Sequence, residues 1–433
     1  MSIYVVNFIE FCQVNQPMLL YPFFLGLYQI ISKRLAPFNV KIKHWVEGQK
    51  EVWHIIESQA KEIKTPIIWV HCASYGEFEQ GLPMIDAIKK EYSTYQIWLT
   101  FFSPSGYLHR KNDKSVHFTS YLPLDSHHHA KRFLQTIRPS LIVFIKYEFW
   151  YYYLAEAKKL SIPTILVSAI FRKDQLFFKW YGGFYKKMLQ LFTYVLVQDE
   201  NSKKLITPII GEEKIGITGD TRFDRVLQTT QQNVSFDWLY KLNASKIIIA
   251  GSTWEKDHEI IAIASKELNN LNWIIVPHHV DTASIEKCKT AFPHATTLTE
   301  LLQTNQTFNN PKTIIVDQIG LLRSLYQFAF ISYVGGGFGK EGIHNILEPA
   351  AFGHPVIWGP HFEKFPEASG LLKMGGGYRI FDGHSLTNTL HLLIHNPEQY
   401  QLASKNASQY IQQNAGATLK TIQWIQEKQL LIP

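Results

Sequence analysis

The pattern of hydrophobic and polar positions changes near residue 65. From there to about residue 200, short apolar runs alternate with longer stretches whose apolar positions recur at helical spacing. Strands that alternate with helices in this way predict parallel β–α–β units. The expected strands are PIIWVHCA (66–73), QIWLTFF (96–102), LIVFIKY (141–147), PTILVSA (163–169) and YVLVQD (194–199).

This alternation pauses in a polar connection, ITGDTRFDRVLQTTQQNVSFD (217–237), and then resumes. Because 433 residues are too many for one typical core, two domains are expected. The boundary should lie between roughly 222 and 240, and we place it after residue 225. The prediction is two doubly wound, Rossmann-like α/β domains that face each other across a cleft, with ligands at the carboxyl ends of the strands. The expected strands of the second half are KIIIAGS (246–252), NWIIVPH (272–278), KTIIVD (312–317), FAFISYVGG (328–336) and PVIWG (355–359).

Residues 1–40 follow a different pattern. The mostly apolar run MLLYPFFLGLYQII (18–31) is shorter than the ~20 residues that span a bilayer, and Lys33 and Arg34 follow it. Such a segment suits the membrane interface, with its cations on cytoplasmic headgroups. A core helix of the first domain is the alternative. We expect no cleavable signal peptide, because residues 1–6 lack a basic leader.

Composition narrows the choice of partners. The formal net charge of +7 favours an anionic partner, such as phosphates, acidic lipid or nucleic acid, although ordinary lysine-rich drift would also produce it. No nucleic-acid-binding module is recognisable, so a nucleic-acid polymer is not expected. Cys12, Cys72 and Cys288 are far apart and form neither a disulfide framework nor a zinc spacing, which indicates a reducing compartment.

Polar residues follow several of the expected strands. Glu77 comes just after the strand 66–73, in HCASYGEFEQGLP (71–83), where the strand gives way to a helix. Glu148 follows the strand 141–147, and Arg222 lies in TGDTRFD (218–224). In the second half, Ser252 and Thr253 follow one strand, and His278 and His279 end another. Each residue alone could be a helix cap or a loop residue, but all lie where a cleft ligand is expected.

The glycine-rich stretch YVGGGFGKEGIHNILEPAAFGHPVIWGP (333–360) is the richest motif. Its glycines allow close approach of the backbone to a ligand, and a helix that opens near His344 and Asn345 would favour an anion. Gly337, Gly339 and Gly342 spell GxGxxG, but the motif lies deep in the second domain. A P-loop is excluded because Glu341 follows Lys340. A phosphate or sugar is therefore expected here, and Glu348 could accept hydrogen bonds from sugar hydroxyls. The alternative is a structural turn with a capping asparagine.

Two other segments carry residues that can form a binding site. The consecutive histidines 127–129 would diverge on a helix, and no Asp-x-Asp pair occurs, so neither a metal nor another cofactor is expected. FRKDQLFFKWYGGFYKKML (171–189) combines basic and aromatic residues, which suits a lipid headgroup interface or, alternatively, a helix with a buried aromatic face.

Five blocks in order resemble the 3-deoxy-D-manno-octulosonic acid (Kdo) transferases of lipopolysaccharide synthesis, a GT-B glycosyltransferase family. VHCASYGEFEQGLP is similar to the family's His-x-x-Ser-x-Gly-Glu block, and YEFW to its Glu-Leu-Trp block. TGDTRFD resembles Thr-Gly-x-x-Lys-Phe-Asp, and AGSTWE resembles Ser-Thr-His-Glu. VGGGFGKEGIHNILEPAAFGHPVIWGPH follows Gly-Gly-His-Asn-x-Leu-Glu-x-Ala-Ala-x-x-x-Pro-Val-x-x-Gly-Pro-His. The family usually has arginine where His278 stands, lysine where Arg222 stands, and glutamate where Leu321 stands.

The resemblance implies CMP-Kdo as donor, the lipid A precursor disaccharide as acceptor, and the cytoplasmic face of the inner membrane as location. It implies a direct, inverting transfer without metal, in which Glu77 is the general base and Glu148 and Arg222 assist. A helix N-terminus near Glu77 would favour its ionised form. Residues 1–40 would meet the anionic membrane, 41–225 would bind the acceptor, and 226–433 the donor. The expected donor-site residues are Ser252, Thr253, Pro277, His278, Ile319, Gly320, Leu321, Gly337, Gly339, Asn345, Ile346, Leu347 and Glu348.

Two other functions are compatible with parts of the sequence. Gly337, Gly339 and Gly342 would suit an NAD-linked or sugar-nucleotide epimerising enzyme on a similar two-domain scaffold. The segments 18–34 and 171–189 would suit a non-catalytic membrane adaptor. NADH titration would detect the first, and vesicle binding without turnover would indicate the second.

Overall fold

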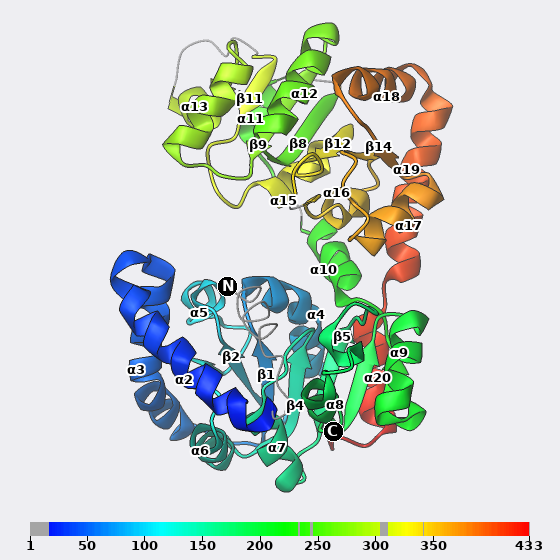
Figure 1. Cartoon of the computed structure of the whole chain (residues 1–433). Helices are drawn as coiled ribbons and strands as arrows, with labels where there is room; N and C mark the ends of the chain where they lie inside the picture. Colours follow the sequence, from blue (N-terminus) through cyan, green and yellow to red (C-terminus); the bar gives the residue numbers. More distant parts are fainter. Residues whose placement is uncertain (1–16, 233, 243–245, 304–310, 341, 433) are drawn as a thin grey trace. The chain divides into compact units, whose positions relative to one another are not determined.

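The computed structural model describes residues 17–232, 234–242, 246–303, 311–340 and 342–432 (Figure 1). Contacts divide the chain into two compact units. Unit 1 comprises Met1–Arg225 and Ala415–Pro433, and unit 2 comprises Val226–Asn414. The chain leaves unit 1 within α10 (Thr221–Thr230) and returns between α19 (Pro397–Asn414) and α20 (Ala417–Glu427).

Unit 1 is built on a seven-stranded sheet in which every strand pair is parallel, in the order β3-β2-β1-β4-β5-β6-β7. The order reverses between β1 and β4, so these two central strands flank the point where a doubly wound sheet binds its ligand. The strands are β1 (Ile67–Cys72), β2 (Gln96–Phe101), β3 (Phe118–Tyr121), β4 (Pro139–Ile145), β5 (Thr164–Ala169), β6 (Tyr194–Val197) and β7 (Ile215–Ile217).

Both faces of this sheet are buried, which explains why its central strands read as continuous apolar runs. Side chains alternate between the two faces: Trp69 belongs to one core cluster, and Val70 and Cys72 belong to the other. The helices of unit 1 besides α10 and α20 are α2 (Pro17–Leu35), η1 (Ala36–Phe38), α3 (Val40–Ala60), α4 (Tyr75–Glu91), α5 (Pro104–Arg110), α6 (His127–Ile137), α7 (Tyr151–Lys159), η2 (Leu176–Phe178), α8 (Gly183–Leu189), α9 (Glu200–Ile210) and η3 (Glu212–Lys214).

The C-terminal helix corrects the predicted domain limits. Residues 415–433 were assigned by sequence to the second domain, but α20 packs on unit 1. Ile422 and Ile425, one helical turn apart, are buried in the core cluster that contains Val70. Asp224 of α10 accepts hydrogen bonds from the backbone N–H groups of Gly416 and Thr418 at the start of α20. The helix therefore completes one face of the unit 1 sheet.

The apolar N-terminal helix α2 lies on unit 1 with one face packed and the other exposed. Tyr21, Leu25 and Tyr28 pack against the core cluster around Trp69. Phe23 and Ile30 are exposed, at 64% and 54% of their surface. Among the described residues, no helix is long and apolar enough to cross a membrane. Residues 1–16, which include Cys12 and part of the predicted membrane-associated segment, lie outside the described residues.

A buried carboxyl group fastens α2 to the rest of unit 1. The Tyr21 hydroxyl donates to Asp125 Oδ2 at 2.6 Å, and the backbone N–H groups of Tyr152 and Tyr153 also donate to this carboxyl group. Burial raises the pKa of Asp125 to about 7, although these hydrogen bonds act in the opposite direction. The group therefore keeps its proton in the folded protein under conditions where an unfolded aspartate, with a pKa of about 3.9, has lost it.

We expect Asp125→Asn to gain stability relative to the wild type as the pH rises from 5 to 8. The folded-state pKa is raised, so the contribution of Asp125 is full below about pH 4 and is lost as the pH rises through about 7. The gain should be on the order of 2–3 kcal/mol in the free energy of unfolding. Urea denaturation at both pH values measures it. Exposed Glu62→Gln is the control, and an Asp125→Asn effect that is equal at both pH values would contradict the assignment.

Unit 2 repeats the architecture with a second parallel sheet, in the order β10-β11-β9-β8-β12-β13-β14. Its order reverses between β8 and β12. The strands are β8 (Ile247–Thr253), β9 (Asn272–Pro277), β10 (Thr296–Thr297), β11 (Thr313–Ile315), β12 (Ile331–Val334), β13 (Val356–Trp358) and β14 (Gly377–Arg379). The helices besides α19 are α11 (Asp237–Lys241), α12 (Glu255–Glu267), α13 (Thr282–Ala291), α14 (Leu298–Gln303), α15 (Leu322–Leu325), η4 (Tyr326–Phe328), α16 (Leu347–Ala351), α17 (Pro366–Met374) and α18 (Gly383–His395).

The predicted fold class, two doubly wound Rossmann-like α/β domains, is confirmed by these two sheets. Each predicted strand overlaps an observed one. The four strands that the sequence did not predict, β3, β7, β10 and β14, are the edge strands of the two sheets. In the segment 171–189, Phe177 and Phe184 are buried, as the alternative of a buried aromatic face predicts, and Trp180 is 84% exposed.

Candidate active site

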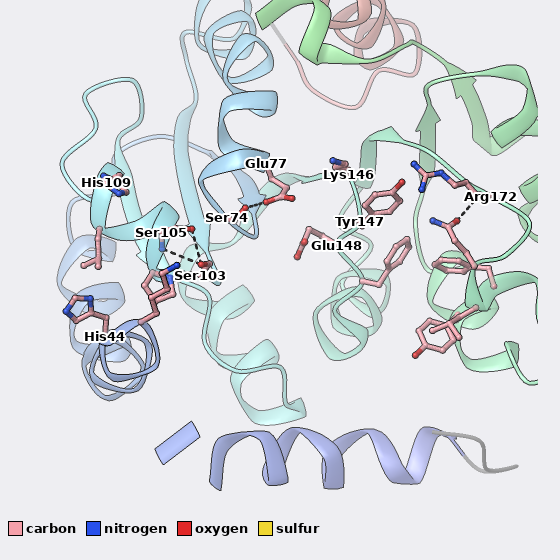
Figure 2. Close-up of a pocket in the computed structure, with 18 of the residues that line it drawn as sticks. His44, Ser74, Glu77, Ser103, Ser105, His109, Lys146, Tyr147, Glu148 and Arg172 are labelled. Atoms are coloured by element: carbon pink, nitrogen blue, oxygen red, sulfur yellow. Dashed lines mark hydrogen bonds between the residues drawn. The ribbon is translucent and has the colours of Figure 1, made fainter. Parts of the chain in front are cut away.

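Unit 1 contains a cavity of about 1100 Å³ at the carboxyl ends of its central strands. Its lining comes from the segments that follow β1, β2, β4 and β5, together with the start of α3 and one residue of α8. Figure 2 shows Glu77 and Glu148 between a group that includes His44, Ser103 and His109 and a group that includes Lys146, Tyr147 and Arg172. The lining residues are Lys41, His44, Ser74, Glu77, Ser103, Pro104, Ser105, Leu108, His109, Lys146, Tyr147, Glu148, Phe149, Arg172, Asp174, Gln175, Leu176, Phe177 and Tyr185.

Glu77 lies in the first turn of α4, directly after β1. The helix begins at Tyr75 and runs through Pro83. The Ser74 hydroxyl donates a hydrogen bond to Glu77 Oε2 (Figure 2). The backbone N–H groups of the first helical turn and the helix dipole favour a negative charge at this position. Glu77 is thus a half-buried carboxylate that faces a cavity large enough for a sugar ligand.

Ion pairs on the other side of α4 hold this helix in place. Glu79 accepts hydrogen bonds from Arg110 and Arg225, at 3.1 and 2.9 Å. Gln80 donates to Asp220 Oδ1 at 3.1 Å, and Asp220 also pairs with Arg222 at 2.7 Å. Arg222, predicted as a catalytic residue, is therefore held by its neighbouring aspartate. It does not line the cavity itself, but its charge acts on Tyr147, which does.

Glu148, the second predicted carboxylate, follows β4 and is 5% exposed. His71 Nε2 lies 3.1 Å from Glu148 Oε2, and Trp150 Nε1 donates to the same oxygen at 2.7 Å. Burial raises the pKa of Glu148, and the charge of Glu77 acts in the same direction, whereas the hydrogen bond from His71 lowers it. The two carboxyl groups thus interact although they follow different strands, because β1 and β4 are neighbours in the sheet.

His71 was not predicted as a site residue, and it connects Glu148 to the sheet. It is paired with Thr100 in the β1–β2 register, and its Nδ1 lies 2.8 Å from Thr100 Oγ1. Trp69, two residues earlier on the same face of β1, donates to Thr100 Oγ1 at 2.7 Å. With Glu148 ionised, one arrangement satisfies these groups: the Thr100 hydroxyl donates to His71 Nδ1, and His71 Nε2–H donates to Glu148. The sequence signal was a histidine inside an otherwise apolar strand.

We expect His71→Phe to lower the free energy of unfolding by about 1–3 kcal/mol, because a buried carboxyl group loses a hydrogen-bond donor. The remaining donor, Trp150, cannot replace it. Denaturant unfolding measures the change. His128→Phe, an exposed histidine in the first turn of α6, should change stability by less than about 0.5 kcal/mol. Equal stabilities of His71→Phe and the wild type would contradict the role of His71.

In unit 2, the residues after β8 and β12 are joined by one buried carboxylate. Asp257 Oδ2 accepts hydrogen bonds from the backbone N–H groups of Trp254 and Gly336, at 2.8 and 2.9 Å. Tyr333 donates to Asp257 Oδ1 at 2.6 Å. Because β8 and β12 flank the reversal of strand order, this junction lies where a doubly wound sheet binds its ligand.

The glycines after β12 are required by close backbone packing. A Cβ on Gly337 would lie 2.7 Å from the backbone of Gly359. His361 N–H donates to the carbonyl of Gly337, and His361 Nδ1 lies 3.1 Å from the carbonyl oxygen of Gly339. Gly337 thus allows these two loops to pack against each other.

The predicted donor-site residues of unit 2 lie at several strand ends. Ser252 adopts φ +53° at the end of β8, and the buried Thr253 hydroxyl lies 2.9 Å from His258 Nε2. Pro277 ends β9 and is buried, and His278 N–H donates to the carbonyl of Thr253. Ile319, Gly320 and Leu321 precede α15; Ile319 is 86% exposed, and Gly320 adopts φ +90°. Asn345, Ile346, Leu347 and Glu348 are at the start of α16.

The start of α16 differs from the sequence expectation. The helix begins at Leu347, not near His344, and spans five residues. Asn345 Oδ1 accepts a hydrogen bond from Leu347 N–H, as in the capping alternative. Ile346 and Leu347 are buried as whole residues, at 1% and 0% of their surface, so this structure does not present them to a ligand. Glu348 is half-buried, and its Oε1 lies 3.1 Å from Arg323 Nε.

An aromatic stack that the sequence did not predict flanks the glycine loop. The His278 ring stacks on both Trp254 and His344, with ring centroids 4.7 and 4.4 Å away. Trp254 Nε1 donates to His344 Nε2 at 2.9 Å, so that nitrogen carries no proton. Burial, with His278 and His279 nearby, lowers the pKa of His344 to about 4. Burial and His279 also lower the pKa of His278. The stack is therefore largely uncharged at neutral pH.

Within the described part of the chain, no three His, Cys, Asp or Glu side chains are placed to hold a metal ion. Cys72 and Cys288 are buried free thiols.

Comparison with known proteins gives consistent results. Residues 47–225 match the family model described as 3-deoxy-D-manno-octulosonic-acid transferase (kdotransferase). A Chlamydophila psittaci 3-deoxy-D-manno-octulosonic acid transferase is 31% identical over 348 residues, which cover 77% of this chain and 78% of the relative. An Aquifex aeolicus protein of the same name is 31% identical over 78% of this chain and 89% of its own length. The structure of UDP-GlcNAc 2-epimerase from Neisseria meningitidis has a similar fold, with a TM-score of 0.61 at 14% identity, covering 84% of this chain and all of that one.

Proposed function

This chain belongs to the 3-deoxy-D-manno-octulosonic acid (Kdo) transferase family, and we propose that it transfers Kdo from CMP-Kdo to the disaccharide of a lipid A precursor. Glycosyl transfer of Kdo in lipopolysaccharide synthesis is the activity of the family. The observation that carries the finer proposal is the pair Glu77 and Glu148, which follow adjacent central strands and line one cavity of unit 1. The epimerase likeness concerns the fold alone.

Glu77 is proposed as the general base of a single displacement. The acceptor hydroxyl attacks the anomeric carbon of the donor, and its proton passes to the Glu77 carboxylate. The bond between that carbon and the phosphate oxygen breaks, and CMP leaves with the electron pair. One displacement inverts the anomeric configuration. The proposal uses neither a covalent sugar–enzyme intermediate nor a metal.

Glu148 and Arg222 are proposed to support this step. When ionised, Glu148 would place a second negative charge close to Glu77 and would favour the positive charge that develops on the sugar as its bond to phosphate breaks. Arg222, held by Asp220, would keep a positive charge near Tyr147 for the anionic groups of the reactants. Both roles rest on the position of these residues around the cavity.

Unit 2 is proposed to bind the CMP part of the donor. Glu348 would accept hydrogen bonds from the ribose hydroxyls, and the glycine loop after β12 would lie against the phosphate. His278 stands where the family usually has arginine. Because the lowered pKa of His278 leaves it uncharged at neutral pH, it would act through an N–H group and by stacking on Trp254, not through charge.

Membrane attachment to the cytoplasmic face of the inner membrane is also proposed. The outer face of α2 exposes Phe23, Ile30 and Ile31, and the adjoining η1 exposes Phe38 at 87%. Lys33 and Arg34 lie in the last turn of α2. Aromatic and aliphatic side chains bordered by cations suit an anionic membrane interface. Lys41 and His44, which line the cavity, follow this surface at the start of α3, so a lipid-borne acceptor would be close to the base.

The experiment is a transfer assay with purified protein, labelled CMP-Kdo and lipid A precursor in detergent micelles. We expect the label to move into the lipid extract, with and without a chelator such as EDTA. Label that stays in the donor, or appears only as free Kdo, would contradict the proposal. If EDTA stops the transfer, only the metal-independent part of the proposal is contradicted.

A further inference from the structure

The cavity of unit 1 has two cations beside its carboxylates whose role is not explained by the proposed general base. Lys146 follows β4 and Arg172 follows β5, and both line the cavity (Figure 2). The sheet order β1-β4-β5 places the segments after these strands side by side. The three segments therefore present Glu77, then Lys146 with Glu148, then Arg172, along one edge of the sheet.

The backbone at Lys146 is fixed in an uncommon conformation. Its φ of +70° lies in the left-handed region, which costs a residue with a side chain roughly 1 kcal/mol or more. Its N–H donates to the carbonyl of Val167 in β5 at 2.8 Å, which ties the start of this loop to the neighbouring strand. Glu148 follows two residues later, so the same short loop presents a cation and a carboxylate to the cavity.

Arg172 is held by a separate turn. Its backbone N–H donates to Gln175 Oε1 at 3.0 Å, and the preceding Phe171 N–H donates to Ser202 Oγ at 2.9 Å. Phe171 is buried in the core. Arg172 therefore extends from a fixed point at the rim of the cavity.

Tyr147 lies near both cations and lines the same cavity. Burial raises the pKa of its phenol, and the charges of Arg172 and Arg222 lower it. Lys146 Nζ lies 5.7 Å from the centre of the Tyr147 ring. The carboxylates that face this group are Asp220, which pairs with Arg222, and Asp174, Glu77 and Glu148, which line the cavity. Guanidinium, ammonium and phenol groups are donors that suit a phosphate monoester, and Arg172, Lys146 and Tyr147 bring all three to this side of the cavity.

We propose that Lys146 and Arg172 form the binding site for a phosphate group on the acceptor sugar and so orient the acceptor hydroxyl towards Glu77. The inference rests on the proposed function. Glu77 and Glu148 repel an anion, so the phosphate lies on the Tyr147 side of the cavity and the hydroxyl on the carboxylate side. Phosphate binding thereby excludes the reversed orientation of the sugar.

The test compares the phosphorylated lipid A precursor with the same lipid after phosphatase treatment. Equilibrium binding to the wild type, Arg172→Gln and Lys146→Gln is measured in detergent micelles without donor. We expect the wild type to prefer the phosphorylated lipid by roughly 10- to 100-fold, as charge-assisted hydrogen bonds produce, and each variant to lose most of this preference. Lys173→Gln, an exposed lysine next to Arg172 that does not line the cavity, should keep it.

Two results would overturn the inference. One is a wild type that binds both lipids equally. The other is a variant that keeps the full preference for phosphate but binds CMP-Kdo more weakly, which would assign these cations to the anionic groups of the donor. Because binding is measured without turnover, a failure of Kdo transfer in the labelled-donor assay would reject the proposed function separately. Thermal unfolding of each variant distinguishes a lost preference for the phosphorylated lipid from a loss of fold.

Discussion

Glu77→Gln is expected to lower the turnover number for Kdo transfer by roughly 10²- to 10⁴-fold, the usual contribution of a general base. Glutamine cannot take the proton of the acceptor hydroxyl at neutral pH. Its side-chain oxygen can still accept the hydrogen bond from Ser74, so the first turn of α4 should keep its structure. Initial rates at saturating donor and acceptor measure the effect.

The control for this variant lies on the same helix. Glu91→Gln changes an exposed carboxylate at the end of α4 and should leave turnover within twofold of the wild type, because surface substitutions rarely have large effects. The melting temperature and the affinity for CMP of Glu77→Gln should match those of the wild type. A turnover number that Glu77→Gln leaves unchanged would remove Glu77 from the role of base.

Glu348→Gln is expected to weaken CMP binding by roughly 10- to 100-fold, since charge-assisted hydrogen bonds to ribose hydroxyls would become neutral ones. Glu348 lies in the first turn of α16, half-buried and 3.1 Å from Arg323 Nε. Calorimetric titration with CMP measures the change without needing the acceptor.

A loss of CMP affinity in Glu348→Gln has an alternative explanation, which is the loss of the ion pair with Arg323. A variant of Arg323 distinguishes the two explanations. If Glu348 contacts the nucleotide itself, Arg323→Gln should weaken CMP binding less than Glu348→Gln does. Glu398→Gln, an exposed first-turn glutamate of α19, should have no effect. Equal losses in the Glu348 and Arg323 variants would indicate that the pair shapes the loop, and unchanged affinity in Glu348→Gln would contradict ribose binding.

The central strands of both sheets could be predicted because they are buried on both faces and therefore read as unbroken apolar runs. The edge strands could not. β10 has two residues, and β7 and β14 have three each. An edge strand is paired on one side only, and short strands of this kind carry little apolar pattern. β3, with the sequence FTSY, is buried yet half polar.

The order of segments along the chain does not show which domain a segment joins. The sequence indicates where apolar runs stop, but the return of α20 to unit 1 depends on which surface its apolar face covers. Ile422 and Ile425 give the helix an apolar face, but they do not identify the sheet it covers. Only the contacts of this helix, and the cap that Asp224 provides, assign it to unit 1.

The candidate site was predictable where strand ends carry charge. Glu77 and Glu148 follow apolar strands, and both line the cavity. His71 was missed because a residue inside a strand is ordinarily read as core, and its partner Thr100 lies 29 positions away in the sequence. Lys146 and Arg172 were missed because their convergence depends on the neighbouring positions of β4 and β5 in the sheet. The stack of Trp254, His278 and His344 likewise joins three separate segments.

Mass spectrometry of the lipid product most directly tests the claim that this chain transfers Kdo with Glu77 as base. Purified wild type and Glu77→Gln would each be incubated with CMP-Kdo and lipid A precursor, and the molecular mass of the extracted lipid would be measured. The account predicts that the wild type shifts the precursor mass by whole Kdo residues, whereas Glu77→Gln leaves nearly all of it unshifted in the same time. An unshifted precursor with the wild type, or equal shifts with both proteins, would contradict it.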